Sequence, residues 1–184
     1  PIWFLIPPII STVAYMIVFG NIAKLPTDGL PQMLFYMSGI IGWKYFSSSL
    51  MATSNTFLAN AGIFGKVYFP RLVIPISTVI SGLIQFAIQF VLLLAMMVFF
   101  KLRGADFSPG IQVLLLPLLI LLMAGLGLGF GILISSLTTK YRDMKNLVGF
   151  GIQLWMYITP VIYPVSALGE KYRILILLNP LTPV

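Results

Sequence analysis

The sequence predicts an all-α membrane protein, a polytopic bundle of transmembrane helices in a single domain. Of its 184 residues, 59% are hydrophobic and only 8% are charged, and the mean hydropathy is +1.04. Soluble proteins carry about 25% charged residues, and a globular core of this length could not bury so much apolar surface. The apolar runs lack the alternation found in outer-membrane strands, so the expected spanning elements are helices.

Five apolar segments make up most of the chain, and short connectors carry nearly all of its charge. The segments are residues 1–23, 31–58, 72–100, 111–139 and 147–163. A transmembrane helix needs about 20 residues, so each of the first four is long enough to span, and we interpret the fifth as a span as well. Because the chain starts without Met and ends without a charged tail, we expect residues 1–184 to be truncated at both ends, with a sixth span to follow.

The fifth segment is interrupted by proline. Pro160 and Pro164 each remove an amide donor and clash with the preceding turn, so the helix is expected to break there. The apolar run 174–178 that follows is too short to span. The sequence therefore predicts a re-entrant or interfacial element over residues 164–180, before the last span.

Composition excludes several kinds of chemistry. The chain has no His and no Cys, so we expect no metal site and no thiol nucleophile. Its eleven basic residues are scattered among apolar runs, which argues against a nucleic-acid surface and for contacts with membrane lipids. The two alternating sets of connectors hold five Lys and Arg residues each, so the positive-inside rule does not orient the chain.

Glycines recur at every second position in the fourth segment. They form two overlapping pairs with a spacing of four, Gly125 with Gly129 and Gly127 with Gly131. Pairs of this kind let membrane helices approach each other closely. The run is not GxGxxG and has no following Lys-Ser/Thr, so helix packing is predicted rather than nucleotide binding.

Two polar features fall inside the predicted spans. Lys44 is a charge within the second segment, and such a charge marks a functional site by default, unless its side chain snorkels to the interface. In the third segment, polar residues recur every four positions on one drifting helical face: Ser77, Ser81, Gln85 and Gln89. A polar path and a set of interhelical hydrogen bonds explain that stripe equally well.

Aromatic residues supply candidate sugar contacts. Tyr36 and Trp43 are seven residues apart on one face of the second segment, and Trp155, Tyr157 and Tyr163 cluster near the break in the fifth. Aromatic rings suit the C–H face of a sugar, while hydroxyl and indole groups offer polar contacts. An interfacial aromatic belt is the alternative explanation for the same residues.

The connector 59–71 is short, partly apolar and flanked by charge. We expect an amphipathic turn or helix at the membrane surface, where it could dock a soluble partner. An ordinary connector is the alternative.

Three sequence blocks follow one another at characteristic spacing. They are Leu58-x-Asn60 through Lys66-x-Tyr68-Phe69-Pro70-Arg71-x-x-x-Pro75, then Tyr141-Arg142-Asp143-x-x-Asn146-Leu147 leading to Thr159-Pro160-Val161-Ile162-Tyr163-Pro164, then Asn179-Pro180-Leu181. The chain resembles, in these blocks, the permease subunits of type-2 ATP-binding-cassette exporters. The branch it resembles exports lipid-linked polysaccharides such as O-antigen, capsule and teichoic acid. It departs from the family pattern at Thr159, where Ser is usual, and at Lys44, where an apolar or aromatic residue is usual.

The resemblance implies an orientation and partners. Connectors 59–71 and 140–146 would face the cytoplasm, 164–180 would face outward, and 59–71 would be the coupling helix. A separate ATP-binding subunit and a second copy of this chain would complete the transporter. The residues implied to contact the ATP-binding subunit are Asn60, Phe64, Lys66, Tyr68, Phe69, Pro70, Arg71, Tyr141, Arg142 and Asp143. This chain has no phosphate-binding loop, so ATP and Mg²⁺ are expected on the partner and no cofactor on this chain.

The prediction is thus the membrane subunit of an ATP-driven exporter of lipid-linked polysaccharide, in the bacterial cytoplasmic (inner) membrane. Its predicted substrate path includes Tyr36, Trp43, Lys44, Trp155, Tyr157 and Tyr163. A type-2 exporter of drugs or small lipids, and a channel or scaffold subunit that works without ATP, remain alternatives. A membrane-embedded transferase is disfavoured because the spans hold no His and no carboxylate, and no enzymatic role is predicted.

Overall fold

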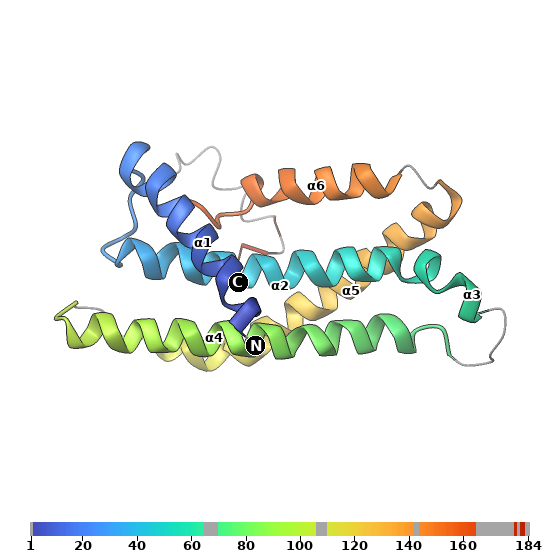
Figure 1. The fold of residues 1–184 in the computed structure, drawn as a ribbon, viewed down its shortest axis with the longest axis horizontal. Coiled ribbons are helices and arrows are strands. Elements are labelled where there is room, and N and C mark those ends of the chain that lie inside the picture. The colour runs from blue at the N-terminus through green and yellow to red at the C-terminus, as the bar shows by residue number, and fades with distance from the viewer. Residues whose placement is uncertain are drawn as a thin grey trace.

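A computed structural model of the chain describes residues 2–64, 70–105, 110–141, 144–164, 179 and 181–182. Within these ranges all regular structure is helical, which confirms the all-α class. The elements are η1 (Ile2–Phe4), α1 (Ile6–Tyr15), η2 (Met16–Ile22), α2 (Gln32–Ala59), α3 (Ala61–Phe64), α4 (Val73–Leu102), η3 (Ile111–Leu115), α5 (Leu116–Lys140) and α6 (Met144–Ile158). Helices therefore occupy each of the five apolar segments (Figure 1). Most of the predicted re-entrant element, residues 165–178 and 180, lies outside the described residues.

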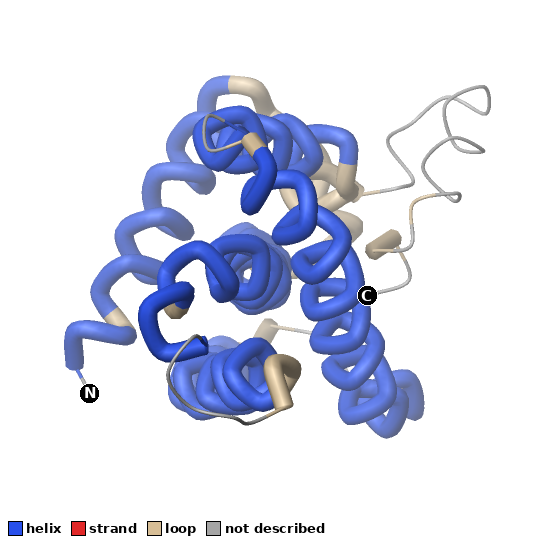
Figure 2. The backbone as a smooth tube through the Cα atoms, turned by 90° about the vertical axis from the view of Figure 1, so that its right-hand side faces the viewer, coloured by secondary structure: helices blue, strands red, loops and turns tan. Residues whose placement is uncertain are grey.

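The helix α2 forms the centre of the bundle. It packs against α1, α4, α5 and α6, and the view along the bundle shows these helices arranged around it (Figure 2). Tyr36, Met37 and Phe46 of α2 are completely buried. Of the three longest helices, α2 is the least apolar, because it carries many Ser and Thr residues. Polar groups are tolerated at membrane depth when protein rather than lipid surrounds them, which accounts for the central position of this helix.

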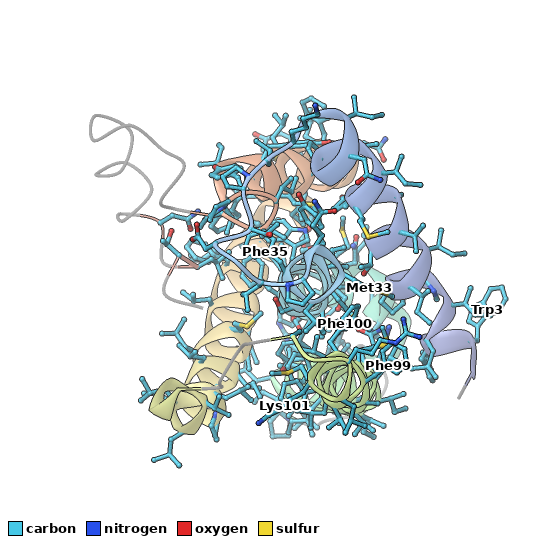
Figure 3. All side chains as sticks on the ribbon, turned by 90° about the vertical axis from the view of Figure 1, so that its left-hand side faces the viewer. Trp3, Met33, Phe35, Phe99, Phe100 and Lys101 are labelled. Carbon is cyan, nitrogen blue, oxygen red and sulfur yellow. The ribbon has the colours of Figure 1, made fainter. Side chains whose placement is uncertain are left out.

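The outer helices expose their apolar side chains. Val73–Leu102 and Val113–Thr139 are each long and apolar enough to cross a membrane, and only 11% of the most apolar window of each is buried. Side chains radiate from the bundle on all sides in the end-on view, where Trp3 projects away from the other helices (Figure 3). This exterior suits hydrocarbon as the surrounding solvent. Ile6–Ile22 is a shorter apolar helix, and the full count of five spans remains a prediction.

Glycines bring α5 into close contact with α2. A Cβ atom added at Gly131 would lie 2.5 Å from the Cβ of Thr53, and one added at Gly127 would lie 3.0 Å from the Cβ of Ser49. Because no real Cβ fits at the shorter distance, the two helices could not approach this closely with any other residue at position 131. The α2–α5 contact thus depends on one of the two glycine pairs.

The other glycine pair faces away from α2. A Cβ atom added at Gly125 or Gly129 would meet no atom of the described chain within 4 Å. Beyond the glycines, the α2–α5 contact continues with a hydrogen bond, in which the Thr138 hydroxyl donates to the Ser54 carbonyl oxygen at 2.9 Å. The four glycines therefore divide into a pair in the interface and a pair on the open surface.

Candidate functional site

The helix α6 ends at the proline break predicted from the sequence. Its last residue lies two positions before Pro160, and the chain then turns toward α2. The Thr159 hydroxyl donates to the Trp155 carbonyl oxygen at 2.9 Å, which satisfies an acceptor in the last turn of the helix. The carbonyl oxygen of Val161 lies 2.8 Å from the position that a Cβ of Gly39 would take, so this glycine lets the turned chain rest on the α2 backbone.

Asn179 ties a distant part of the chain to this break. Its Nδ2 donates to the Thr159 hydroxyl at 2.9 Å, and its Oδ1 accepts from the indole Nε1 of Trp155 at 3.4 Å and from the amide of Leu181 at 3.2 Å. A buried amide that satisfies three other polar groups holds them in a fixed arrangement. The second and third sequence blocks thus meet at this point, although 20 residues separate Thr159 from Asn179.

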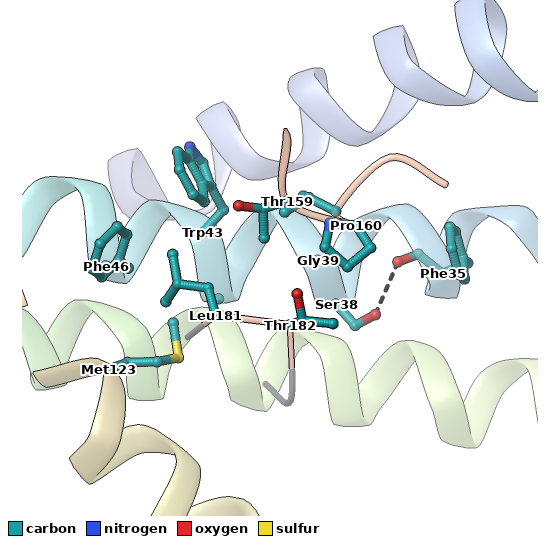
Figure 4. Close-up of a pocket in the computed structure, with 12 residues that line it drawn as sticks. Phe35, Ser38, Gly39, Trp43, Phe46, Met123, Thr159, Pro160, Leu181 and Thr182 are labelled. Atoms are coloured by element: carbon teal, nitrogen blue, oxygen red, sulfur yellow. Dashed lines mark hydrogen bonds between the residues drawn. The ribbon is translucent and has the colours of Figure 1, made fainter. Parts of the chain in front are cut away.

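A pocket of about 210 Å³ opens between α2, α5 and the turned chain (Figure 4). Its wall includes Phe35, Ser38, Trp43 and Phe46 of α2, Met123 of α5, and Thr159 at the break. Apolar rings beside hydroxyl groups suit a ligand that is apolar on one face and polar at its edge, such as a sugar ring. Sites for drug-sized molecules have volumes of about 300–1,000 Å³, so this pocket within one chain accepts a single ring rather than an oligosaccharide.

A second cavity of about 150 Å³ lies on the other side of Ser38, Gly42 and Met123. Its remaining wall comes from α2, α4 and α5 and is entirely apolar, with Phe86, Phe90 and Leu93 on the α4 side. The second cavity offers no polar group besides Ser38, so the pocket at the break is the better candidate for a polar ligand.

Of the predicted aromatic residues, the structure brings Trp43 to this pocket. Tyr36 is completely buried, and its hydroxyl has no hydrogen-bond partner among the described residues. Tyr157 is 53% exposed, and the Tyr163 hydroxyl donates to the Tyr157 carbonyl oxygen at 3.1 Å. None of these three tyrosines lines the pocket, although Tyr36 and Tyr163 pack in one apolar cluster with Trp43.

Trp155 lies behind the pocket in the packed interior. Its ring meets the rings of Phe46 and Phe130 edge-on, with centroids 5.3 and 5.4 Å away. Its indole N–H is already bonded to Asn179. Trp155 thus contacts two residues of the pocket wall, Phe46 through its ring and Thr159 through its carbonyl oxygen, but has no place in the wall itself.

Several residues of the pocket were not expected from the sequence. Phe35, Gly39, Gly42 and Phe46 are spaced by four, three and four positions, which places them on one face of a helix. The sequence shows that spacing, but nothing in the sequence of α2 indicates which face of the helix contacts the turned chain. Thr159 and Leu181 come from different parts of the sequence and meet in this wall beside the hydrogen bonds of Asn179.

Lys44 occupies a different surface from Trp43. It borders a small cavity with Ser48 of α2 and with Gln85 and Gln89 of α4, on the opposite side of α2 from the pocket. The polar stripe of α4 runs from the surface into the interior: Ser77 and Ser81 are exposed, Gln85 is half-buried, and Gln89 is buried.

The described residues of the predicted coupling region gather at one end of the bundle. The end of α2, α3, the start of α4 and the end of α5 all lie there (Figure 1). The Asn60 side chain donates to the Thr56 carbonyl oxygen at 2.8 Å and closes α2, and the Phe64 ring lies 5.7 Å from that of Phe57. Pro70, Arg71 and Tyr141 are exposed. Lys66, Tyr68, Phe69, Arg142 and Asp143 lie outside the described residues.

Comparison with known proteins gives one family. The model of the family described as "ABC-2 type transporter" matches residues 2–184. The chain is 28% identical to the O-antigen export system permease protein RfbA of Klebsiella pneumoniae over 181 residues, which is 98% of this chain and 67% of the relative.

Two further relatives have related names. The RfbA protein of Myxococcus xanthus, also an O-antigen export system permease protein, is 26% identical over 98% of this chain and 67% of its own length. The polysialic acid transport protein KpsM of Escherichia coli is 25% identical over 100% of this chain and 69% of its own length. The chain therefore spans about two-thirds of the length of these relatives. Since the family model covers nearly every residue, the family predicted from the three sequence blocks is confirmed, and the chain belongs to the ABC-2 type transporter family of membrane proteins.

Proposed function

We propose that this chain is the membrane-spanning subunit of an ATP-driven exporter that moves a lipid-linked polysaccharide across the bacterial cytoplasmic membrane. The observation that carries the proposal is the similarity over nearly the whole chain to permeases named for O-antigen export and polysialic acid transport. The cargo class is an O-antigen, capsule or teichoic-acid type of glycan. A type-2 exporter of drugs or small lipids has the same family membership and is the main competing function.

The proposed topology has five spans in these residues and a sixth after them. Connectors 59–71 and 140–146 face the cytoplasm, and the element 164–180 faces outward. Two copies of the chain form the export path together. The gathering of α3 and the adjoining helix ends at one end of the bundle supports this arrangement, because a single soluble partner could contact all of them there.

In this proposal, the connector 59–71 couples ATP binding in the partner subunit to movement of the membrane helices. A separate subunit binds ATP with Mg²⁺ and holds this connector, with Tyr141, Arg142 and Asp143 nearby. A partner shifts a conformational equilibrium only if it binds the two states with different affinity. The ATP-bound and ATP-free partner must therefore contact residues 59–71 differently, and the attached helices α2 and α4 move as a result.

The sugar path runs, we propose, past the pocket at the proline break. Trp43 is the aromatic residue with the best-supported role, because it lines the pocket beside the Ser38 and Thr159 hydroxyls. Tyr36, Trp155, Tyr157 and Tyr163 remain proposed path residues on their sequence positions, with the second copy of the chain completing the surface.

The deciding experiment has two parts. The full-length protein is purified from its native membrane in mild detergent, and stoichiometric companions are identified by mass spectrometry. In parallel, lipid-linked glycan is measured in cells that lack the protein. A co-purifying P-loop ATPase together with accumulated lipid-linked glycan supports the proposal.

Other results favour the alternatives. An ATPase partner without glycan accumulation indicates an exporter of drugs or small lipids. Absence of any ATPase, under conditions that preserve other membrane complexes, indicates a channel or scaffold subunit.

A further inference from the structure

Two hydroxyl groups in the wall of the pocket at the proline break have already given up their protons. The Ser38 hydroxyl donates to the Phe35 carbonyl oxygen at 2.9 Å, drawn as the dashed line in Figure 4, and the Thr159 hydroxyl donates to that of Trp155 at 2.9 Å. A hydroxyl group has one proton and two lone pairs. Both groups can therefore accept a hydrogen bond from a ligand, but neither has a proton left to donate.

The backbone amides at the break are also used. The amide of Thr159 donates to the Trp155 carbonyl oxygen at 3.0 Å, and that of Val161 donates to the Thr159 carbonyl oxygen at 2.7 Å. Pro160, between them, has no N–H at all. The break therefore presents a ligand with no free backbone donor.

The part of the wall that lies beside Asn179 repeats this pattern. The amide of Leu181 donates to the Asn179 side-chain oxygen at 3.2 Å, and the amide of Thr182 donates to the Asn179 carbonyl oxygen at 3.0 Å. None of the five described wall residues outside the helices, at 159–161 and 181–182, thus has a free backbone N–H.

The end of α6 adds negative potential at the same place. The helix ends at Ile158, directly before three residues of the wall. The C-terminal end of a helix carries about half a negative charge, and no basic residue lies in the last turn of α6 to offset it. The helix end and the oxygen lone pairs therefore both favour hydrogen-bond donors and disfavour anions.

No positive charge balances this potential within the described wall, which contains neither Lys nor Arg. Lys44 follows Trp43 in the sequence but borders the small cavity on the opposite side of α2. The polar hydrogens on the Trp43 and Thr182 side chains belong to neutral groups. A carboxylate that left water for this pocket would lack a counter-charge, which is costly, whereas a sugar hydroxyl could donate to the oxygens of the wall.

We propose that this pocket selects an uncharged sugar residue of the exported glycan and rejects an acidic one, such as a uronic or a sialic acid. The inference rests on the proposed function and adds to it the charge class of the sugar that the pocket binds. Discrimination of this kind comes from the cost of the wrong ligand rather than from extra contacts with the right one. A glycan made only of acidic residues would therefore not bind there.

The test compares sugars that differ only in charge. Methyl glycosides of glucose, galactose and mannose, and the uronate of each, are titrated by saturation-transfer NMR at neutral pH. The full-length protein is used with its ATP-binding subunit, in phosphatidylcholine nanodiscs. The neutral glycoside that binds best should bind about tenfold or more tightly than its uronate, a difference of about 1.4 kcal/mol or more. The methyl ester of that uronate, which has no charge, should bind within about threefold of the neutral glycoside.

A lysine introduced at the pocket should reverse the preference. Ser38 is exposed, so a long side chain fits there, and Ser38→Lys should raise the affinity for the uronate by about tenfold while the neutral glycoside changes by less than about threefold. Ser136→Lys is the matched control. Ser136 is likewise exposed and donates to a carbonyl oxygen three residues earlier, but it does not line the pocket, so neither affinity should change.

A smaller change locates the bound sugar without adding charge. A Cβ atom at Gly42 would lie 3.6 Å from the Met123 methyl carbon, an ordinary contact, so Gly42→Ala should fold. Its methyl group narrows the pocket, and the affinity for the neutral glycoside should fall by about threefold or more. Gly129→Ala, whose methyl group meets no described atom, should bind as the wild type does.

Four results would overturn the inference. They are equal affinity for the uronate and its neutral glycoside, an ester that binds as weakly as the uronate, no binding of any of the three neutral glycosides, and wild-type affinities in both Ser38→Lys and Gly42→Ala. Accumulation of lipid-linked glycan in cells that lack the protein is measured separately. If glycan accumulates while the pocket shows no charge preference, the exporter function stands and the inference about this pocket fails.

Discussion

At position 131, the α2 and α5 backbones come closer than any side chain allows. Gly131→Ala would place a methyl group 2.5 Å from the Cβ of Thr53, so the helices must separate. Overpacking of this kind costs about 1–3 kcal/mol, and we expect a lower thermal midpoint of the detergent-solubilised protein, measured by fluorescence-detected size exclusion. Gly129→Ala is the matched control: its methyl group meets no described atom, and the gain in helix propensity leaves the midpoint equal or higher. Equal midpoints for the two variants would contradict this packing.

At Trp43, the expected effect is on transport rather than on stability. Trp43→Ala removes the indole from the wall of the pocket, and we expect export of lipid-linked glycan to fall by about threefold to tenfold, at an unchanged membrane level. Trp3→Ala is the control, because Trp3 is 76% exposed and projects away from the bundle. Normal export by Trp43→Ala would indicate instead that Trp43 belongs to an interfacial aromatic belt.

Hydropathy predicts where the helices lie in the sequence, but it does not predict which face of each helix packs against its neighbours. The apolar segments 31–58, 72–100 and 111–139 correspond within a few residues to α2, to α4 and to η3 with α5. The fifth predicted segment, 147–163, lies a few residues later than the helix itself, because α6 begins at Met144 and ends at Ile158. Polar residues near its start lower the average hydropathy without stopping the helix, and Pro160 ends it before residue 163.

The facing of each helix depends on contacts that hydropathy does not encode. Trp155 was expected to face a sugar, yet its indole bonds to Asn179, which is 24 residues away in the sequence. Likewise, the two glycine pairs of α5 are equivalent in sequence, and only the position of α2 distinguishes them. A prediction from one sequence can state that such groups pack, but not against what.

The connector 59–71 is predicted to couple ATP turnover to export. In the double variant Tyr68→Ala with Phe69→Ala, binding of the ATP-binding subunit should be unchanged or weaker. The ATP turnover of that subunit should no longer depend on the permease, and export should stop. The reason is that aromatic side chains such as Tyr are enriched among the few residues that dominate the binding energy of protein interfaces. ATP turnover and glycan export are measured in the same proteoliposomes.

A variant at the other end of α4 controls for general damage. Leu102→Ala removes an apolar side chain that is 83% exposed, far from the connector, and should change neither rate. Unchanged export in the Tyr68 and Phe69 double variant would contradict the coupling role of the connector.

For the whole molecule, orientation is the property to test. The chain contains no Cys, so each introduced Cys is a unique label within these residues. We expect a membrane-impermeant maleimide to label Thr27→Cys and Arg103→Cys in spheroplasts, because the half-buried Thr27 and the exposed Arg103 lie in connectors predicted to face outward. Gly62→Cys and Thr139→Cys should be labelled only after the membrane is permeabilised.

Spans that differ from the proposal would change this pattern in a specific way. If α2 does not cross, Thr27→Cys and Gly62→Cys will be labelled from the same side. If α4 or α5 does not cross, Arg103→Cys will share the labelling of one of its neighbours. Each pair of neighbouring labels thus tests one crossing.

The hydrogen bond between Asn179 and Thr159 has a consequence for how this protein can diversify. Because Asn179 is hydrogen-bonded to Thr159, the chain that joins residue 164 to residue 179 must begin and end at the same corner of the bundle. The entropic cost of closing a loop rises slowly with length, by about 0.6 kcal/mol for each doubling. Insertions between residues 164 and 179 should therefore cost little folding stability. Evolution can lengthen this stretch, and an experimenter can place an epitope tag there, while the helices keep their arrangement.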